Sequence, residues 1–475
     1  MSISLTILFL TISHGIGIAT SLHAILHARS AQGSVAWCFF LIGMPYFAVP
    51  VYWVFGRNRF QGYIYAHNDG LNELKEILDY AQLGPMDVAD NPELTVELIR
   101  RTQHLARLPF TSGNSVKLLI DGEATFDSIF AGIEAAHDYI LLQFYIVRDD
   151  DLGRKISTKL IDKAATGVEI YFLYDEIGSI GLSSSFLGAL RAAGIHVSTF
   201  NTTKGLRNHF QINFRNHRKI VVVDGAVAWV GGNNIGDEYL GRNQSIGRWR
   251  DTHVRIEGPA AIPIQLSFVE DWHWATDEAL NELMWSPPEM PDAEAGILVI
   301  PSGPADKQKT ATLTFVEAIN FAGSRLWITS PFFVPSESII VALQAAALRG
   351  VDVRIMIPDK SSHRLISLAA YSYIDDLQKS GVEFYRYEDG FLHQKVLLVD
   401  DSFAFIGTMN LDNRSLHLNF EITTVILDNY FVNQVEAMLL RDFRYCRQMD
   451  HGYYAGRKLW FRLAVSVVKL AAPVL

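Results

Sequence analysis

Two segments of the sequence carry a histidine and a lysine at a spacing that could act on a phosphate ester. Each has the form His-x-Lys followed by four apolar residues and an aspartate, and a Gly-x-x-Asn sequence follows each at the same distance. The residues are His217, Lys219, Asp224 and Asn234 in the first segment, and His393, Lys395, Asp400 and Asn410 in the second. One such segment would be weak evidence of a site, but a matched pair indicates one site built from both.

A pair of histidines can divide a two-step displacement at phosphorus between them. One neutral imidazole attacks the phosphorus atom and forms a phosphohistidine. The other, protonated, gives its proton to the leaving alkoxide and later takes a proton from the incoming alcohol. An unperturbed imidazole pKa near ~6.5 suits both roles at neutral pH. The sequence therefore predicts phosphodiester transfer.

The lysines and asparagines of the two segments are expected to bind the phosphate. Lys219 and Lys395 would supply positive charge, and Asn234 and Asn410 would supply amide donors. The sequence contains neither a metal-binding HExxH motif nor a GxxxxGK[ST] nucleotide loop. We therefore expect no metal ion and no other cofactor.

Four acidic residues are further candidates for the site. Asp251 in the sequence Trp-Arg-Asp and Glu421 in Asn-Phe-Glu follow the two histidines at comparable distances, so each could orient an imidazole. Asp224 and Asp400 complete the two segments and are candidate catalytic residues. Each also begins a turn-like dipeptide, so the alternative is that these two carboxylates bond the turn.

An internal repeat is expected to position these residues. In both halves a helix precedes three strand-like runs, with the second half offset from the first by a nearly constant number of residues. The predicted helices cover residues 126–137 and 315–322, and the predicted strands cover residues 139–145, 167–174, 194–197, 326–330, 350–357 and 381–384. This alternation indicates an α/β fold with mostly parallel sheets. Two halves, 113–290 and 291–450, would face each other and place the site at their seam.

Each His-x-Lys segment is expected to begin a buried strand that turns back on itself. Residues i and i+2 of a strand share a face, so the histidine and lysine should point into one cleft. The dipeptides at 224–225 and 400–401 predict hairpins with return strands at residues 226–230 and 402–406. The return strand would bring the asparagine back beside the histidine.

Two uncharged apolar runs predict a membrane anchor over residues 1–59. Residues 4–26 and 35–55 each approach the ~20 residues that cross a bilayer core, and a short polar turn separates them. We therefore expect a transmembrane helical hairpin. Arg57 and Arg59 after the second run favour a cytoplasmic body. A cleaved signal peptide is the alternative for the first run, which lacks the basic n-region of such peptides.

The next segment, residues 60–112, is expected to form an amphipathic helical linker. Leu71, Leu74, Ile77 and Leu78 recur there at helical spacing.

The C-terminal segment, residues 451–475, is expected to form a basic amphipathic helix. Lys458, Arg462 and Lys469 share one helical face beside a row of apolar residues. The segment is too short to span a bilayer. It fits either the surface of an anionic membrane or the protein's own body.

The composition narrows the class of protein. The chain has 475 residues, a net charge of -10 and 49% hydrophobic residues. An acidic chain is an unusual nucleic-acid binder, so we expect no nucleic-acid partner. Cys38 lies in an apolar run, so no disulfide with Cys446 is expected and the body should face the reducing cytoplasm. The oligomeric state stays open.

At these residues the chain resembles the phospholipase D superfamily, and in particular the bacterial cardiolipin synthases with two motifs. The resemblance extends from the anchor to the C-terminus and rests on the sequences around residues 55–59, 216–220, 249–253, 330–335, 391–395 and 410–415. It implies phosphatidyl transfer between two phosphatidylglycerol molecules, giving cardiolipin and glycerol, at the bacterial cytoplasmic (inner) membrane. It also implies that His217 is the nucleophile and His393 the acid. The residues alone leave that assignment open, because the two motifs are nearly symmetric.

Two other classes of function remain to be weighed. A hydrolase, either a phospholipase or a nuclease, could use the same motifs with water as acceptor, although the anchor and the acidic charge count against a nuclease. A non-enzymatic membrane scaffold would not need histidine, lysine and asparagine intact in both halves.

Overall fold

The structure is a computed structural model that describes most of the chain. The described residues are 2–28, 30–57, 60, 63, 93–200, 203, 213–243, 246–286, 290, 292–360, 364–454 and 456–472. The predicted helical pattern of Leu71, Leu74, Ile77 and Leu78 lies outside these ranges, as does Arg59. The described end of the predicted linker contains helix α5 (Glu93–Ala106).

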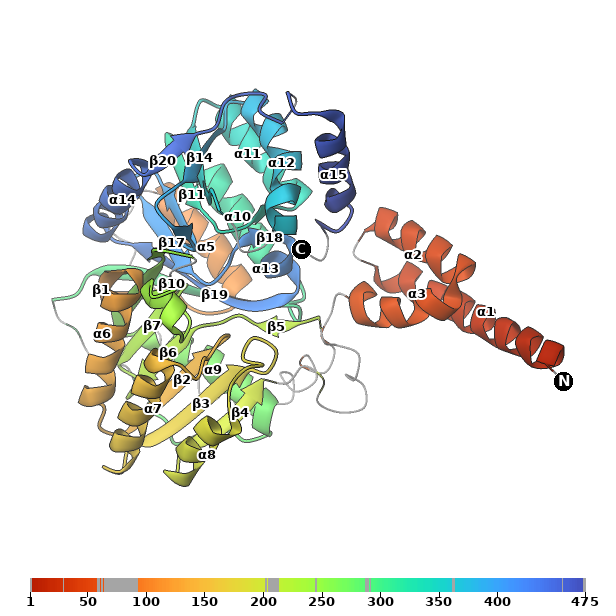
Figure 1. Cartoon of the computed structure of the whole chain (residues 1–475). Helices are drawn as coiled ribbons and strands as arrows, with labels where there is room; N and C mark the ends of the chain where they lie inside the picture. The colour runs from red at the N-terminus through yellow and green to blue at the C-terminus, as the bar shows by residue number, and fades with distance from the viewer. Residues whose placement is uncertain are drawn as a thin grey trace.

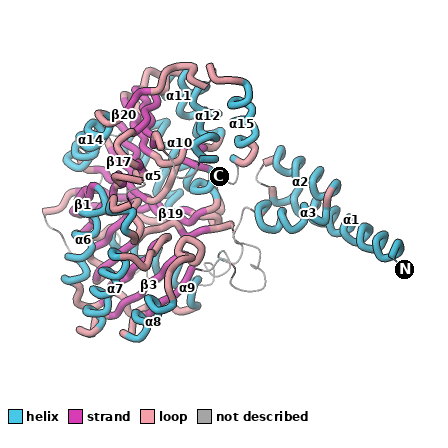
Figure 2. The backbone as a smooth tube through the Cα atoms, viewed as in Figure 1, coloured by secondary structure: helices cyan, strands magenta, loops and turns pink. Residues whose placement is uncertain are grey.

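The body alternates strands and helices in both halves, as the sequence predicts (Figures 1 and 2). The first half contains β1 (Thr111–Ile120), α6 (Asp121–Ala135), β2 (Tyr139–Phe144), α7 (Asp151–Ala164), β3 (Glu169–Asp175), α8 (Ser184–Ala192), β4 (His196–Phe200), β5 (Arg215–Asn216), β6 (Ile220–Val223), β7 (Val227–Gly231), the 3-10 helix η3 (Asp237–Leu240), β8 (Trp249–Arg250), β9 (Thr252–Glu257) and α9 (Ala261–Thr276). The second half contains β10 (Ala295–Ser302), α10 (Thr310–Phe321), β11 (Arg325–Thr329), β12 (Phe333–Val334), α11 (Glu337–Leu348), β13 (Asp352–Pro358), α12 (Arg364–Lys379), β14 (Glu383–Tyr387), β15 (Phe391–Leu392), β16 (Val396–Val399), β17 (Phe403–Gly407), β18 (Leu411–Asp412), α13 (Asn413–His417), β19 (Asn419–Leu427), α14 (Asn429–Phe443), β20 (Cys446–Gln448) and α15 (Leu459–Lys469).

One mixed sheet runs through both halves. Among the described residues it has 16 strands, in the order β20-β14-β13-β11-β16-β17-β19-β10-β1-β9-β7-β6-β2-β3-β4, with β5 paired to β19 off this path. The antiparallel pair β1 and β10 joins the halves, with Thr111 opposite Ile297. The strand order on one side of this pair repeats on the other, which accounts for the repeat in the sequence.

The expectation of mostly parallel sheets is wrong. Parallel pairing is confined to β2-β3-β4, β11-β13-β14 and the short β5-β19 contact, whereas the other pairs of the large sheet are antiparallel. The cause is that each half adds a hairpin and a long return strand to its parallel βαβ units. The predicted hairpins are confirmed, because β6 pairs with β7 and β16 with β17 in antiparallel register.

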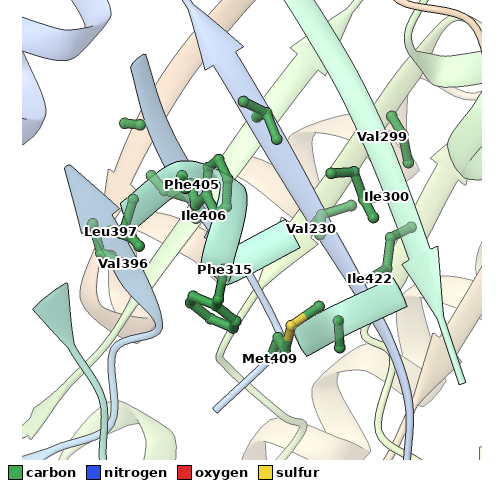
Figure 3. Close-up of a cluster of buried hydrophobic side chains, with 14 of the residues drawn as sticks. Val230, Val299, Ile300, Phe315, Val396, Leu397, Phe405, Ile406, Met409 and Ile422 are labelled. Carbon is green, nitrogen blue, oxygen red and sulfur yellow. The ribbon is translucent and has the colours of Figure 1, made fainter. Parts of the chain in front are cut away.

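The hydrophobic core continues across the two halves. Figure 3 shows Val230 of the first half close to Val299, Ile300 and Ile422 of the second. All four side chains are fully buried. Burying a side chain of this size contributes roughly 1.5–3 kcal/mol. The shared core therefore fixes the halves relative to each other.

The N-terminal segment forms helices outside the body (Figure 1). They are α1 (Ser2–His27), α2 (Ala31–Gly43), α3 (Pro45–Val51) and the π-helix η1 (Tyr52–Gly56). Among the described residues, Leu5–His27 is the one helical segment long and apolar enough to cross a membrane. The second apolar run is divided at Pro45, because proline has no N–H with which to continue α2. Helices α1 and α2 still contact each other, since Ser34 Oγ donates to the Ala24 carbonyl at 3.1 Å.

The C-terminal helix α15 packs against the body. Val465 is fully buried, and the Phe461 ring lies 5.5 Å from the Tyr371 ring of α12. Asn413 donates a hydrogen bond to the Ala472 carbonyl at 3.1 Å. Of the two predicted environments for this segment, the structure therefore shows docking on the body for one face of the helix.

Candidate active site

Both His-x-Lys segments lie immediately before their strands rather than within them. Residues 217–219 join β5 to β6, and residues 393–395 join β15 to β16. His217 and His393 each expose only 8% of their surface, and Lys219 is fully buried. The expected strand start is therefore displaced by three residues, which leaves the histidine and lysine in irregular backbone at the ends of buried strands.

Short strands cross between the halves and hold both segments. β5 pairs in parallel with β19 of the second half, and His217 N donates to the Phe420 carbonyl at 2.8 Å. β15 pairs in parallel with β8 of the first half, and His393 N donates to the Arg250 carbonyl at 2.8 Å. Each segment is thus aligned by the backbone that leads into an acidic residue of the opposite half.

The orienting acids are the two candidates from the sequence, and each serves the histidine of the other half. His217 Nδ1 lies 2.8 Å from Glu421 Oε2, and His393 Nδ1 lies 2.6 Å from Asp251 Oδ2. Both carboxylates are fully buried. With Nδ1 bonded to a carboxylate, the ring is fixed and Nε2 is left for a ligand. Within the described part of the chain, no protein group hydrogen-bonds either Nε2.

The two carboxylates stay ionised because positive groups surround them. Burial alone would raise the pKa of Asp251, but the charge of Lys395 and the bond from His393 lower it to about 2. Burial likewise opposes ionisation of Glu421, and His217 and Lys219 lower its pKa below the ordinary value. Thr408 Oγ1 also donates to Glu421 Oε2 at 2.6 Å. Both acids can therefore stabilise a protonated imidazole during a reaction.

The histidines themselves are neutral without a ligand. Burial lowers the pKa of His217 to about 4, although Glu421 acts to raise it. Burial and the charge of Lys395 lower the pKa of His393 to about 3, although Asp251 acts to raise it. These values differ from the ordinary imidazole pKa assumed from the sequence, because buried surroundings disfavour the charged form.

The two lysines belong to one electrostatic cluster. Burial lowers the pKa of Lys219 to about 7, and the charge of Lys395 contributes to this lowering. Burial lowers the pKa of Lys395 to about 8. The charge of Lys395 also lowers the pKa of His217, and that of Lys219 lowers the pKa of His393. The segments from the two halves are therefore close enough for each to influence the other's protonation.

The two asparagines differ in their surroundings. Asn234 accepts a hydrogen bond from Ile146 N at 3.1 Å and donates one to the Tyr239 hydroxyl at 3.0 Å, so its amide ties parts of the first half together. Asn410 Oδ1 is buried and has no hydrogen-bond partner among the described residues. This atom is an acceptor and cannot bind a phosphate oxygen, so phosphate binding by the Asn410 amide N–H stays a prediction.

The side chains of Asp224 and Asp400 accept hydrogen bonds from backbone N–H groups at turns. The prediction that they are catalytic is therefore corrected. Asp224 accepts hydrogen bonds from the backbone N–H groups of residues 137–139, and Asp400 accepts from those of residues 323–325. Both have positive φ, 51° and 49°. They lie beyond the far ends of β6 and β16 from the histidines, and the four residues of each strand alone span roughly 13 Å. Their matched positions in the motifs reflect matched turns.

Two aspartates that were not predicted from the sequence accept hydrogen bonds from the middle residue of each His-x-Lys segment. Arg218, the middle residue of the first His-x-Lys segment, donates to Asp271 Oδ2 of α9 at 2.9 Å. Gln394, its counterpart in the second segment, donates to Asp442 Oδ2 of α14 at 2.7 Å. The sequence pattern that could have identified them is an aspartate near the C-terminal end of the helix after each motif, α9 in the first half and α14 in the second.

The rings beside the two histidines are also outside the predicted set. Tyr145 lies 4.9 Å from His217 between ring centroids. Trp249 lies 4.9 Å and Phe391 lies 5.9 Å from His393. In the described residues, no group of three or more histidine, cysteine, aspartate or glutamate side chains could hold a metal ion.

Comparisons with known proteins agree with this arrangement. A family model described as "Cardiolipin synthase, PLD-like domain" matches residues 129–255 and again residues 315–443. Cardiolipin synthase A of Pseudomonas putida (strain W619) is 44% identical over 465 residues, which cover 97% of each chain. Cardiolipin synthase A of Pseudomonas aeruginosa (strain LESB58) is 43% identical over 97% of this chain and 94% of its own.

A solved structure shares the fold at low sequence identity. Phosphatidylserine synthase of Haemophilus influenzae Rd KW20 superimposes with a TM-score of 0.59 at 14% identity, covering 80% of this chain and 100% of its own. The two matched regions of the family model each contain one His-x-Lys segment and the orienting acid of the other. The chain therefore belongs to the cardiolipin synthase family with two phospholipase D-like domains.

Proposed function

We propose that this protein makes cardiolipin by moving a phosphatidyl group from one phosphatidylglycerol to another, with release of glycerol. Its membership of the cardiolipin synthase family supports this activity, as do relatives of that name over nearly the whole chain. The observation that carries the chemistry is the pair of crossed histidine–carboxylate contacts, His217–Glu421 and His393–Asp251. They supply two oriented imidazoles within one lysine-rich cluster.

The reaction proceeds in two displacements. Nε2 of one imidazole attacks the donor phosphorus, the bond from phosphorus to the glycerol oxygen breaks, and the second imidazole protonates that oxygen. The second imidazole then takes the proton of a hydroxyl on the acceptor phosphatidylglycerol, whose oxygen attacks phosphorus and breaks the phosphorus–nitrogen bond. One phosphodiester is lost and one is made, so the exchange requires no nucleotide.

The acid imidazole gains its proton as the substrate binds. Both histidines are neutral in the empty site, since burial lowers their pKa values. An anionic phosphodiester beside them favours the charged form of imidazole. Lys219 and Lys395 hold the phosphate oxygens and stabilise the charge that develops on them.

The anchor supports a location in the bacterial cytoplasmic membrane. Helix α1 is long and apolar enough to cross the bilayer, and the divided run α2–α3 packs beside it. We propose that both runs are embedded as a hairpin and that the body lies on the cytoplasmic face, because Arg57 follows the second run.

Incubating the purified full-length protein with phosphatidylglycerol in mixed micelles tests the activity. Cardiolipin and free glycerol in equal amounts are the expected products, separated by chromatography and mass spectrometry. Phosphatidic acid in place of cardiolipin would identify a hydrolase instead. Absence of any lipid product would overturn the proposal.

A further inference from the structure

A pair of arginines near His217 takes no part in the two displacements. Arg215 precedes His217 on β5, and its Nη1 donates to the Phe214 carbonyl at 2.6 Å. Arg414 comes from α13 of the other half and donates to Asn213, to Oδ1 at 3.0 Å and to the carbonyl at 2.6 Å. Two guanidinium groups from opposite halves are thus attached to neighbouring residues of one segment.

Among the described residues, the guanidinium of Arg414 has no hydrogen-bonded carboxylate. Its side-chain hydrogen bonds go to Asn213, whose acceptors are neutral, although the nearby charges of Asp412 and Asp175 also act on it. Burial and the charge of Arg215 lower the pKa of Arg414. Two like charges held together at a partly buried position favour the binding of an anion.

Tyr145 places this pair beside the reacting centre. Its ring lies 4.9 Å from His217 and within 5.4 Å of Lys219 Nζ. Arg215 hydrogen-bonds the Tyr145 side chain. Burial raises the pKa of this tyrosine, so its hydroxyl stays neutral and available as a donor. The arginine pair therefore adjoins the central phosphate site without being part of it.

The repeat shows that this arginine pair is a specialised feature of one side. The residues that correspond to Arg215 and Arg414 in the repeat are Phe391 and Glu238, since 391−215=176 and 414−238=176. The histidines and lysines are preserved at the same offset. Both motifs are therefore expected to act on the reacting phosphate, whereas the arginine pair is present on one side and is expected to bind a group that only one of the two substrates brings.

We propose that Arg215 and Arg414 bind the phosphodiester of the acceptor lipid, an inference that rests on the proposed function. Cardiolipin carries two phosphates joined by one glycerol. When the acceptor hydroxyl reaches the central phosphorus, the acceptor's own phosphate must therefore lie one glycerol away. Water and free glycerol bring no such anion. This second anion site would thus favour a lipid acceptor over hydrolysis.

A competition between two acceptors tests the assignment. The enzyme receives phosphatidylglycerol together with deuterated glycerol, so that cardiolipin reports the lipid acceptor and deuterated phosphatidylglycerol reports the neutral one. In Arg414→Gln we expect the ratio of cardiolipin to exchanged lipid to fall at least ~10-fold, because a charge-assisted contact is lost. Exchange should persist, which also shows that the variant is folded, and Arg414→Lys should recover part of the ratio.

Arg248→Gln is the matched control on the other side. Arg248 is paired with Asp121 and Asp389, both at 3.0 Å, so the ratio should stay at the wild-type value. An unchanged ratio in Arg414→Gln, or an equal fall in both products, would overturn the acceptor site while leaving the activity established. If the wild-type enzyme formed neither product, the proposed function itself would fail and this inference with it.

A second inference comes from helix α15, which presents three distinct faces. One face packs on the body through Val465. A second, which borders the packed face, carries Lys458, Arg462 and Lys469, with Lys469 Nζ 5.1 Å from the Tyr373 ring of α12, and the helix contains no acidic residue. The third is apolar and exposed: Leu459 70%, Trp460 67%, Leu463 57%, Val467 65% and Leu470 81%. In Figure 1 this helix lies on the side of the body toward the N-terminal helices.

We infer that this exposed face inserts into the headgroup region of an anionic leaflet. A row of leucine, valine and tryptophan beside a basic row matches an interfacial helix, and the basic row complements the negative surface of the lipid substrate. The helix cannot span the bilayer, because 11 residues at ~1.5 Å each fall short of ~30 Å. Docking of its inner face would then orient the body against the membrane.

Spin labels test this contact in the full-length protein reconstituted in phosphatidylglycerol nanodiscs. With Cys38 and Cys446 replaced by serine, a label at Leu463→Cys should be accessible to oxygen and protected from a water-soluble nickel chelate. A label at Ile180→Cys, which is 82% exposed in the first half, should show the opposite pattern. Chelate access at position 463 equal to that at position 180 would contradict the inference.

Discussion

His217 and His393 bond equivalent carboxylates but have different neighbours. Each has an Nδ1 bonded to a buried carboxylate of the other half and a lysine two residues away. Around His217 the next groups are a tyrosine and the arginine pair, whereas around His393 they are the aromatic rings of Trp249, Phe391 and Tyr239. The proposed chemistry at phosphorus needs both imidazoles, and the proposed acceptor site accounts for the difference between their neighbours.

Removal of either imidazole should have the largest effect on this arrangement. We expect His217→Ala and His393→Ala each to lower cardiolipin formation by at least ~10³-fold, because each step requires both groups. Trapping a labelled phosphatidyl group on the remaining histidine would show which histidine is the nucleophile, and the family resemblance implies His217. Near-normal activity in both variants would show that the two motifs do not share a site.

Substitution of the orienting acids tests the crossing itself. Glu421→Gln and Asp251→Asn should each lower the rate by roughly 10²–10⁴-fold, since an amide cannot stabilise the imidazolium. With histidine labelled by ¹⁵N, NMR should show Glu421→Gln perturbing His217 and leaving His393 unchanged. Because the carboxylate acts to raise the pKa of its partner, that pKa should fall further. A perturbation confined to His393 would refute the crossed assignment.

The pH dependence should show the lysines on the alkaline side. Lys219 and Lys395 have pKa values lowered to about 7 and about 8, and only their charged forms hold an anionic substrate. We expect kcat/KM to fall as pH rises above ~5, because the acid imidazole is neutral in the free enzyme and takes up a proton on binding, and to fall more steeply through the range in which the lysines lose their charge. A profile that is flat to pH ~9 would mean that the two ammonium groups are not required.

The turn aspartates should show the smallest effect on turnover and an equal effect in both halves. Asp224→Ala and Asp400→Ala each leave backbone N–H groups without an acceptor, which should lower the free energy of unfolding by ~1–3 kcal/mol. Thermal unfolding measures that loss, and the kcat of the folded enzyme should stay within a few-fold of wild type. Asp401→Ala, next to Asp400 but exposed, is the control. A ~10³-fold loss of kcat at unchanged stability would restore the catalytic assignment.

Local patterns in the sequence predicted much of this site. The hairpins after residues 224 and 400 follow from turn residues between apolar runs, and the candidate acids follow from their comparable positions after each histidine. The crossing of Glu421 and Asp251 could not be predicted, because it depends on β5 and β15 pairing with strands distant in the sequence. The direction of most strands was missed for a related reason. The lowered pKa values follow from burial, which only the assembled fold defines.

Each half contributes a short strand that pairs with the other half, β5 with β19 and β15 with β8. The active site is therefore complete only when both halves have folded. A chain in which only one half has folded holds an imidazole with no carboxylate behind it and a carboxylate with no imidazole to serve. Newly made or partly degraded copies in the membrane therefore lack a competent nucleophile among the lipids that surround them. The enzyme is therefore expected to act on the surrounding lipids only after both halves have folded together.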